Sequence, residues 1–177
     1  MKLQTGLIHI YTGDGKGKTT AAIGQGLRAS GNDLSVYMVQ FLKSSNTGEL
    51  RALEKVENFS IFRFERPRGF FWTLSDEEKA ELQEDIDKAM EFISSVITNS
   101  DCDVLILDEI MGAISNNLVC SEELASLLKS KPEAMEIILT GRNAPENLIE
   151  ISDYVSVITP LKHPFESGIP ARKGIEY

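Results

Sequence analysis

The chain contains few of the side chains that commonly act as acids, bases or covalent nucleophiles. Two cysteines, Cys102 and Cys120, occur without C-x-x-C spacing, which favours two reduced thiols over a disulfide or a metal site. His9 falls inside an expected strand, where a core histidine is the usual role, and His163 precedes Pro164 in a binding loop or a turn. No Ser-His-Asp or Cys-His arrangement is evident. Nucleophilic catalysis by a side chain is therefore not predicted.

Long apolar runs and an excess of basic residues are also missing. No stretch approaches the ~20 apolar residues that span a bilayer, and the start MKLQTGLIHIYTG has too short an apolar run for a signal peptide. The 18 Lys and Arg residues are outnumbered by 27 Asp and Glu residues, which leaves a net charge of -9. Nucleic acids and anionic membranes favour basic surfaces. We therefore expect a cytoplasmic protein that binds neither nucleic acid nor membrane.

Strand and helix patterns alternate along the chain. Apolar runs predict strands at residues 7–11, 35–41, 59–64, 104–107, 134–139 and 154–158, the third of them near a sheet edge. Helical spacing predicts helices at residues 18–30, 48–56, 75–98 and 122–129, the third opened by a capping box of Ser75 and Glu78. Gly31 and Pro145 fit a helix end and a helix first turn. The alternation predicts a single α/β three-layer domain over residues 1–177, with a mostly parallel, about six-stranded sheet.

The stretch TGDGKGKTTAAIG, residues 12–24, has the character of a phosphate-binding loop between a strand and a helix. It departs from G-x-x-x-x-G-K-[ST] because Thr12 stands where the first glycine is expected. The glycines allow backbone N–H groups to point inward as a nest, and the helix N-terminus adds positive potential. We predict nucleotide binding in a P-loop NTPase-like (RecA-like) fold. The predicted binding residues are Gly13, Asp14, Gly15, Lys16, Gly17, Lys18, Thr19 and Thr20.

The run VLILDE, residues 104–109, fits the second half of such a site. An apolar strand that ends in a carboxylate can hold Mg²⁺ directly or through water. Thr19, Asp108 and Glu109 are therefore the predicted metal residues, without a choice between the two carboxylates. The alternative is that Asp108 caps the next helix.

A loop of unusual aromatic content, ERPRGFFWTL, follows the third expected strand. Aromatic clusters are most often core or interface, and a loop beside a phosphate site also suits a flat, apolar second substrate. No signature of a protein kinase is present, and no residue stands out that would orient a nucleophile at a γ-phosphate.

Together these motifs resemble the phosphate-loop class of ATP:corrinoid adenosyltransferases, which act on cob(I)alamin and precursors such as cob(I)yrinic acid a,c-diamide. The similarity spans nearly the whole chain, and the family's loop has the same late first glycine. The matching segments are TGDGKGKTTAA, VQFLK, GE at residues 48–49, GFFW, LDE, TGRNAPENL and KHPFESGIPARKGIEY.

The resemblance implies that ATP binds in a reversed sense, with Co(I) of the corrinoid attacking the ribose C5′ and triphosphate leaving. Cobalt(I) is a strong nucleophile, so no general base is required. Phe70 and Trp72 would displace the lower axial ligand of cobalt, which eases reduction of Co(II). ATP serves as co-substrate with Mg²⁺. An electron-donating reductase, such as a flavoprotein, and a homodimer are the implied partners.

Further residue roles are implied by the same resemblance. Lys18 is central to catalysis, Glu109 is the Mg²⁺ carboxylate with Asp108 close by, and Arg142 meets phosphate. Arg28, on the helix after the loop, either contacts the nucleotide or lies on a solvated face. Residues 168–177 would help line the corrinoid side.

Two departures from the family pattern are visible. Phe71 replaces a small polar residue between the two aromatics, and the first expected strand comes early, whereas some members carry an N-terminal extension.

Two other functions are compatible with the phosphate loop. A P-loop NTPase or small-molecule kinase would give ADP with phosphate or a phosphorylated product. A non-catalytic nucleotide-gated binding module would leave ATP intact and use the aromatic loop as a protein-docking surface.

Overall fold

The computed structural model describes residues 3–43 and 47–176, and within these ranges six strands form one sheet. All strand pairs are parallel, and the order is β3-β2-β4-β5-β1-β6. The parallel sheet and the edge position of β3 confirm the sequence prediction. The strands are β1 (Ile8–Thr12), β2 (Val36–Gln40), β3 (Phe59–Phe62), β4 (Val104–Asp108), β5 (Glu136–Thr140) and β6 (Tyr154–Val157).

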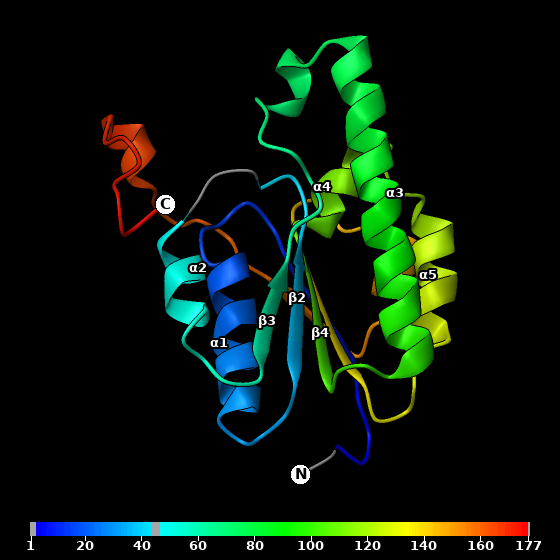
Figure 1. Cartoon of the computed structure of the whole chain (residues 1–177). Helices are drawn as coiled ribbons and strands as arrows, with labels where there is room; N and C mark the ends of the chain where they lie inside the picture. Colours follow the sequence, from blue (N-terminus) through cyan, green and yellow to red (C-terminus); the bar gives the residue numbers. More distant parts are fainter. Residues whose placement is uncertain (1–2, 44–46, 177) are drawn as a thin grey trace.

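Helices cover both faces of the sheet and make three layers (Figure 1). On one face lie α1 (Lys18–Ser30) and α2 (Gly48–Leu53), and on the other lie α3 (Asp76–Asn99), α4 (Ile110–Ser115) and α5 (Ser121–Lys129). The remaining helical elements are the short α6 (Glu146–Ile149) and the 3-10 turns η1 (Phe71–Thr73) and η2 (Pro164–Ser167).

The core divides between the two faces. Strand β4 is buried at every position, as expected for a central strand covered on both sides. Its Leu105 and Leu107 pack with α3 and α5, and its Val104 and Ile106 pack with α1.

Burial also raises the pKa of the Cys102 thiol to about 12, so this thiol stays protonated, and both cysteines are free.

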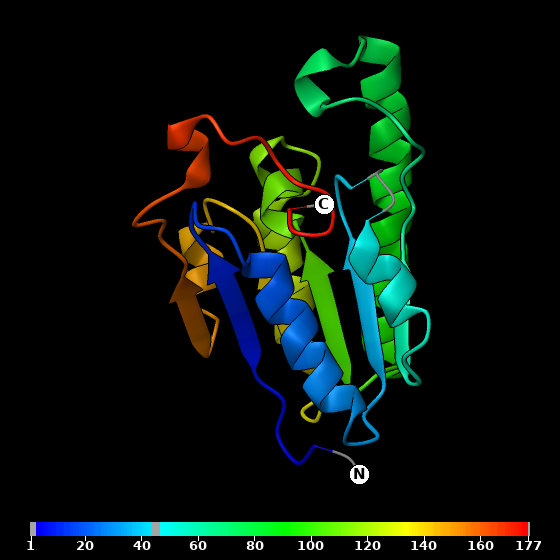
Figure 2. The ribbon, with the colours of Figure 1, turned by 90° about the vertical axis from the view of Figure 1, so that its left-hand side faces the viewer.

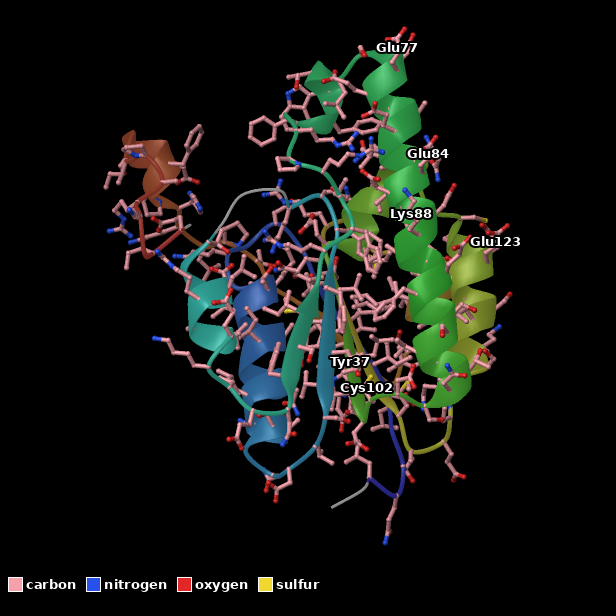
Figure 3. The ribbon with its side chains drawn as sticks, viewed as in Figure 1. Tyr37, Glu77, Glu84, Lys88, Cys102 and Glu123 are labelled. Carbon is pink, nitrogen blue, oxygen red and sulfur yellow. The ribbon has the colours of Figure 1, made fainter. Side chains whose placement is uncertain are left out.

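The start of helix α3 is determined by a local sequence motif. The Ser75 side chain accepts the Glu78 N–H, and the Glu78 carboxylate accepts the Ser75 N–H at 2.8 Å, which is the predicted capping box. Glu77, Glu84 and Lys88 point away from the sheet (Figure 3). Within residues 3–43 and 47–176, no helix combines the length and the apolar character needed to cross a membrane.

Several element boundaries differ from the sequence prediction. Strand β3 and helix α2 are shorter, β5 begins two residues later, and α4 was not predicted. Gly31 caps α1 with φ -65°, and the left-handed turn falls on Asp33 instead. Pro145 lies just before α6 rather than in its first turn.

The carboxyl ends of all six strands lie at the same end of the molecule (Figure 2). The phosphate loop, the β4–α4 turn and the end of β2 meet there, and the C-terminal segment passes over this end. Ligands of open parallel sheets bind at the carboxyl ends of the strands, so the topology defines where the functional site lies.

Candidate active site

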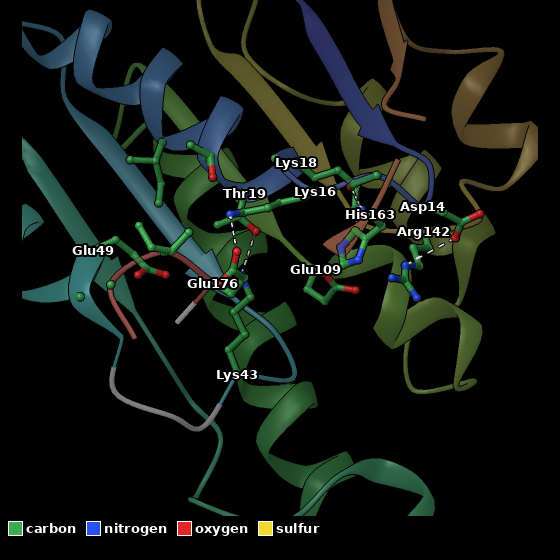
Figure 4. Close-up of a pocket in the computed structure, with 17 residues that line it drawn as sticks. Asp14, Lys16, Lys18, Thr19, Lys43, Glu49, Glu109, Arg142, His163 and Glu176 are labelled. Carbon is green, nitrogen blue, oxygen red and sulfur yellow. Dashed lines mark hydrogen bonds and ion pairs between the residues drawn. The ribbon is translucent and has the colours of Figure 1, made fainter. Parts of the chain in front are cut away.

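A cavity of about 660 Å³ opens above the phosphate loop (Figure 4). It brings together nearly all the residues that were predicted to bind the nucleotide. Its lining includes residues 14–20, Lys43, Glu49, Glu109, Arg142, His163 and residues 174–176.

The loop conformation depends on its glycines in two different ways. Gly13 and Gly17 adopt φ values of 99° and 120°, which side-chain-bearing residues avoid. Gly15 has no positive φ, and it needs space instead: a Cβ there would lie 2.7 Å from the Ile158 carbonyl oxygen. The Gly15 N–H donates to that same oxygen at 2.7 Å. The loop is thus built against the chain that follows β6.

Lys18 closes the loop on itself. Its ammonium donates to the carbonyl oxygens of Gly13 and Gly15 at 2.7 and 2.9 Å. Burial first, and the nearby Arg142 second, lower the pKa of Lys18. The negative charge of an anion in the cavity would offset both effects, so Lys18 is suited to a polyphosphate.

Asp108 is the buried centre of the site, with no exposed surface. Its Oδ1 accepts from the Thr19 and Thr140 hydroxyls at 2.8 and 2.7 Å. Its Oδ2 accepts from Gln40 at 3.1 Å and from the Lys43 ammonium at 2.6 Å. The predicted alternative of a helix cap is wrong, because α4 is preceded by Glu109 and no side chain caps it.

Glu109 stands in the left-handed region with φ 60°, an unusual conformation for a glutamate. Its N–H donates to the Thr140 hydroxyl at 2.9 Å, which fixes this turn to the end of β5. The side chain lines the phosphate cavity and also a second cavity beside it. Strained backbone of this kind gathers at functional sites.

The outer rim of the phosphate cavity carries exposed ion pairs. Arg142 lies 3.5 Å from Asp14, and Lys16 lies 3.1 Å from Glu176 (Figure 4). Exposed pairs contribute little to stability, so Lys16 and Arg142 can turn to an anionic ligand at small cost. The arginine retains its fork of N–H donors for phosphate.

The other predicted residues are placed less uniformly. His163 caps η2, accepting the Phe165 N–H at 3.2 Å, and also lines the phosphate cavity. Arg28 is exposed in the last turn of α1 and lines neither cavity. Residues 174–176 line the phosphate cavity rather than the aromatic one, and Tyr177 lies outside the described residues. A nucleotide contact by Arg28 stays a prediction.

The second cavity, of about 490 Å³, is built around the aromatic loop. Phe70 and Trp72 stack with ring centroids 4.8 Å apart and planes at 2°, and they are 69% and 77% exposed. Phe71 also lines this cavity, but it is partly buried and packs against the core. Lys43 and Glu109 line this cavity as well as the phosphate cavity. A flat apolar surface and a phosphate site therefore share a wall.

Asp85 anchors the aromatic loop and was not predicted. It is 2% exposed on α3 and accepts from Arg66 Nε at 3.1 Å and from Arg68 at 2.7 Å. Although burial opposes ionisation, the hydrogen bond and charge of Arg66 hold the pKa of Asp85 below its ordinary value. An acidic residue on the apolar stripe between Leu82 and Ile86 was the available sequence signal.

The fold and the phosphate loop define a P-loop nucleotide-binding protein. Among solved structures, the chain is similar to the KaiC-like protein PH0186 from Pyrococcus horikoshii OT3. The TM-score is 0.51 and the identity 15%, over 88% of this chain and 72% of that one. This likeness concerns the fold alone, and it confirms the predicted RecA-like architecture.

Sequence comparison then gives the family. Residues 4–177 match the family described as ATP:corrinoid adenosyltransferase BtuR/CobO/CobP. The chain is 35% identical to the corrinoid adenosyltransferase of Sinorhizobium sp, over 98% of this chain and 81% of that protein. It is 34% identical to that of Escherichia coli (strain K12), over 98% and 87%. The chain belongs to this family of ATP-dependent enzymes, which confirms the resemblance.

Proposed function

We propose that the protein transfers the 5′-deoxyadenosyl group of ATP to Co(I) of a reduced corrinoid and releases triphosphate. The observation that carries this proposal is the wall of Lys43 and Glu109 shared by the phosphate cavity and the aromatic cavity. A nucleotide with its triphosphate over the loop can present C5′ toward a flat substrate next to it. The cobalt–carbon bond forms with the electron pair of Co(I), and the C5′–oxygen bond breaks with its pair on triphosphate.

In this reaction the chain positions two substrates and stabilises a leaving group. Lys18, Lys16, Arg142 and the loop N–H groups would neutralise the triphosphate. Holding C5′ in line with cobalt lowers the entropic part of the barrier. The reaction needs no proton transfer, which accords with the scarcity of histidine and with His163 serving as a turn cap.

The residues present fit Mg²⁺. Thr19 Oγ1 already accepts from a cation, the Lys43 ammonium, at 2.8 Å, beside the buried carboxylate of Asp108. Glu109 offers a second carboxylate, which lines the phosphate cavity together with Thr19. Oxygen ligands from one or two side chains, completed by phosphate, are what this ion prefers. When bound, Mg²⁺ would stabilise the negative charge of the departing triphosphate.

Phe70 and Trp72 are proposed to displace the lower axial ligand of cob(II)alamin. Their stacked, exposed rings offer no donor atom to cobalt, whereas Phe71 is partly buried and packs against the core. A four-coordinate Co(II) accepts an electron more easily, and we propose a reductase such as a flavoprotein as the electron donor.

We further propose a homodimer formed through the β6 edge. Strand β6 pairs with β1 alone and exposes Tyr154, Val155 and Val157, and the nearby Leu161 and Phe165 are 95% and 79% exposed. Exposed sheet edges and apolar patches of this kind mark association surfaces. Light scattering of the wild type and of Val157→Lys tests this: a monomeric wild type contradicts the proposal.

An anaerobic absorbance assay tests the reaction. Protein, Mg-ATP and cob(I)alamin should yield adenosylcobalamin with triphosphate, and an incomplete corrinoid in a parallel assay reports substrate range. Decay of the Co(I) spectrum no faster than without protein would refute the proposal. Chromatography of the nucleotide separates the alternatives: ADP indicates an NTPase or kinase, and intact ATP indicates a binding module.

A further inference from the structure

Lys43 is joined to the predicted metal residues by three short contacts. Its ammonium lies 2.6 Å from Asp108 Oδ2 and 2.8 Å from Thr19 Oγ1, and the Thr19 hydroxyl donates to Asp108 Oδ1 at 2.8 Å. The Asp108 side chain is fully buried and that of Lys43 is 25% exposed. An ammonium, a hydroxyl and a carboxylate thus close a triangle at the end of β2 and β4.

The carboxylate requires a cation at this place. Thr19, Thr140 and Gln40 give Asp108 three neutral hydrogen bonds, which satisfy its lone pairs without balancing its charge. A buried charge without a counter-charge is strongly unfavourable. Lys43 supplies this counter-charge, because its ammonium forms the ion pair with the Asp108 carboxylate.

The same contact excludes a metal ion. The Thr19 hydroxyl donates its proton to Asp108 and accepts from Lys43, so the ammonium already occupies the cation position beside this oxygen and the carboxylate. A metal on Thr19 could leave the Thr19–Asp108 hydrogen bond intact, and only the ammonium would have to leave. The Lys43 ammonium and Mg²⁺ repel each other, so they do not occupy this position together.

We propose that Lys43 is a resident counter-cation of the metal position, which holds Asp108 and Thr19 in place until Mg²⁺ arrives with the triphosphate and takes over. This inference rests on the proposed function. Lys43 lines both cavities, and its flexible four-carbon stem lets the displaced ammonium stay at their shared wall, within reach of the triphosphate. Lys43 is in this sense a positioning residue whose place depends on the metal.

The test measures metal binding without ATP or corrinoid, so it is independent of adenosyl transfer. Mn²⁺, used as a paramagnetic probe, is titrated into the full-length wild type, Lys43→Met and Lys16→Met. We expect Lys43→Met to bind Mn²⁺ at least about tenfold more tightly than the wild type, because a competing charge is gone. Lys16→Met removes an equal charge from the same cavity, away from Asp108, and should match the wild type.

Thermal unfolding supplies a second readout. In EDTA, Lys43→Met should melt below the wild type, and Mg²⁺ alone should restore its Tm while leaving the wild type unchanged. Equal Mn²⁺ affinity in Lys43→Met and the wild type, or a lowered Tm that Mg²⁺ does not restore, would overturn the proposal. If Lys43→Met does not fold, Lys43→Gln, which retains a neutral donor, takes the same two measurements under the same criteria.

Discussion

The guanidinium of Arg68 forms an ion pair with the carboxylate of Asp85 at 2.7 Å, and both side chains are more than nine-tenths buried. This pair fixes the loop that carries Phe70 and Trp72 onto α3. Removing one partner of a buried pair costs about 3–5 kcal/mol, so we expect Asp85→Ala to lower the free energy of unfolding by about 3 kcal/mol. Chemical denaturation measures it.

The Asp85→Ala substitution should also affect the two substrates differently. With its anchor gone, the aromatic loop loses its position, and corrinoid turnover should fall while the affinity for ATP is kept. Asp87→Ala, an exposed neighbour on the same helix, is the control and should leave both unchanged. A loss of ATP affinity equal to the loss of turnover would contradict the anchoring role.

Gly13→Ala should damage the phosphate loop. A Cβ at this position would lie 2.5 Å from the Ile158 carbonyl oxygen, and φ is 99°. We expect weaker ATP binding by calorimetry together with a lower Tm. Gly24→Ala is the matched control, because nothing lies within 4 Å of its Cβ and it stands inside α1. It should raise stability by about 0.5–1 kcal/mol, and a stable, ATP-binding Gly13→Ala would refute the steric argument.

Lys18 should contribute to ATP binding, and Trp72 should contribute to the reaction of the corrinoid. Lys18→Ala removes the loop ammonium and should weaken ATP binding by roughly 100-fold or more. Trp72→Ala should leave ATP affinity unchanged and slow the reaction from cob(II)alamin by roughly tenfold, about what one aromatic contact contributes. Equal loss of ATP affinity in both variants would contradict this division.

Glu136 joins β5 to β1 and should shape the acid side of the stability curve. Burial opposes its ionisation, but hydrogen bonds from His9 and the Leu7 N–H hold the pKa of Glu136 below its ordinary value. A lowered carboxyl pKa stabilises the fold above the unfolded pKa of about 4.3 and ceases to do so as pH falls through the folded pKa. The Tm difference between wild type and Glu136→Gln should therefore be full at pH 7 and shrink in acid. Glu133→Gln, at an exposed position, should show no such change.

Local patterns predicted the elements that are held by local interactions. The Ser75–Glu78 capping box and the apolar run of β4 predicted α3 and the central strand correctly. Helix α4 was missed because its short sequence IMGAIS has no capping signal and starts from the left-handed turn at Glu109. Asp85 was missed because its partners lie 17 and 19 residues upstream, in a loop without periodicity. Contacts of this kind depend on the tertiary fold.

For the phosphate site, sequence order predicted which residues gather and left open which of them interact. Gln40 and Lys43 entered the sequence analysis only as part of the matching segment VQFLK. The parallel register of β2 beside β4, with Gln40 opposite Asp108, decides that both side chains meet this carboxylate. Registers between strands almost 70 residues apart are set by packing of the whole sheet.

The carbonyl oxygen of Ile158 that receives the Gly15 N–H has a mechanical consequence. The residue follows directly after β6, the last strand of the sheet, so the most exposed strand is also the outer support of the phosphate loop. A displacement of this edge is transmitted to the loop through two hydrogen bonds of Ile158, one from the Gly15 N–H and one to the Thr12 carbonyl oxygen. If a second chain packs on this edge, as proposed above, its dissociation would leave the phosphate loop less well supported. Turnover per chain should then fall in assays at high dilution.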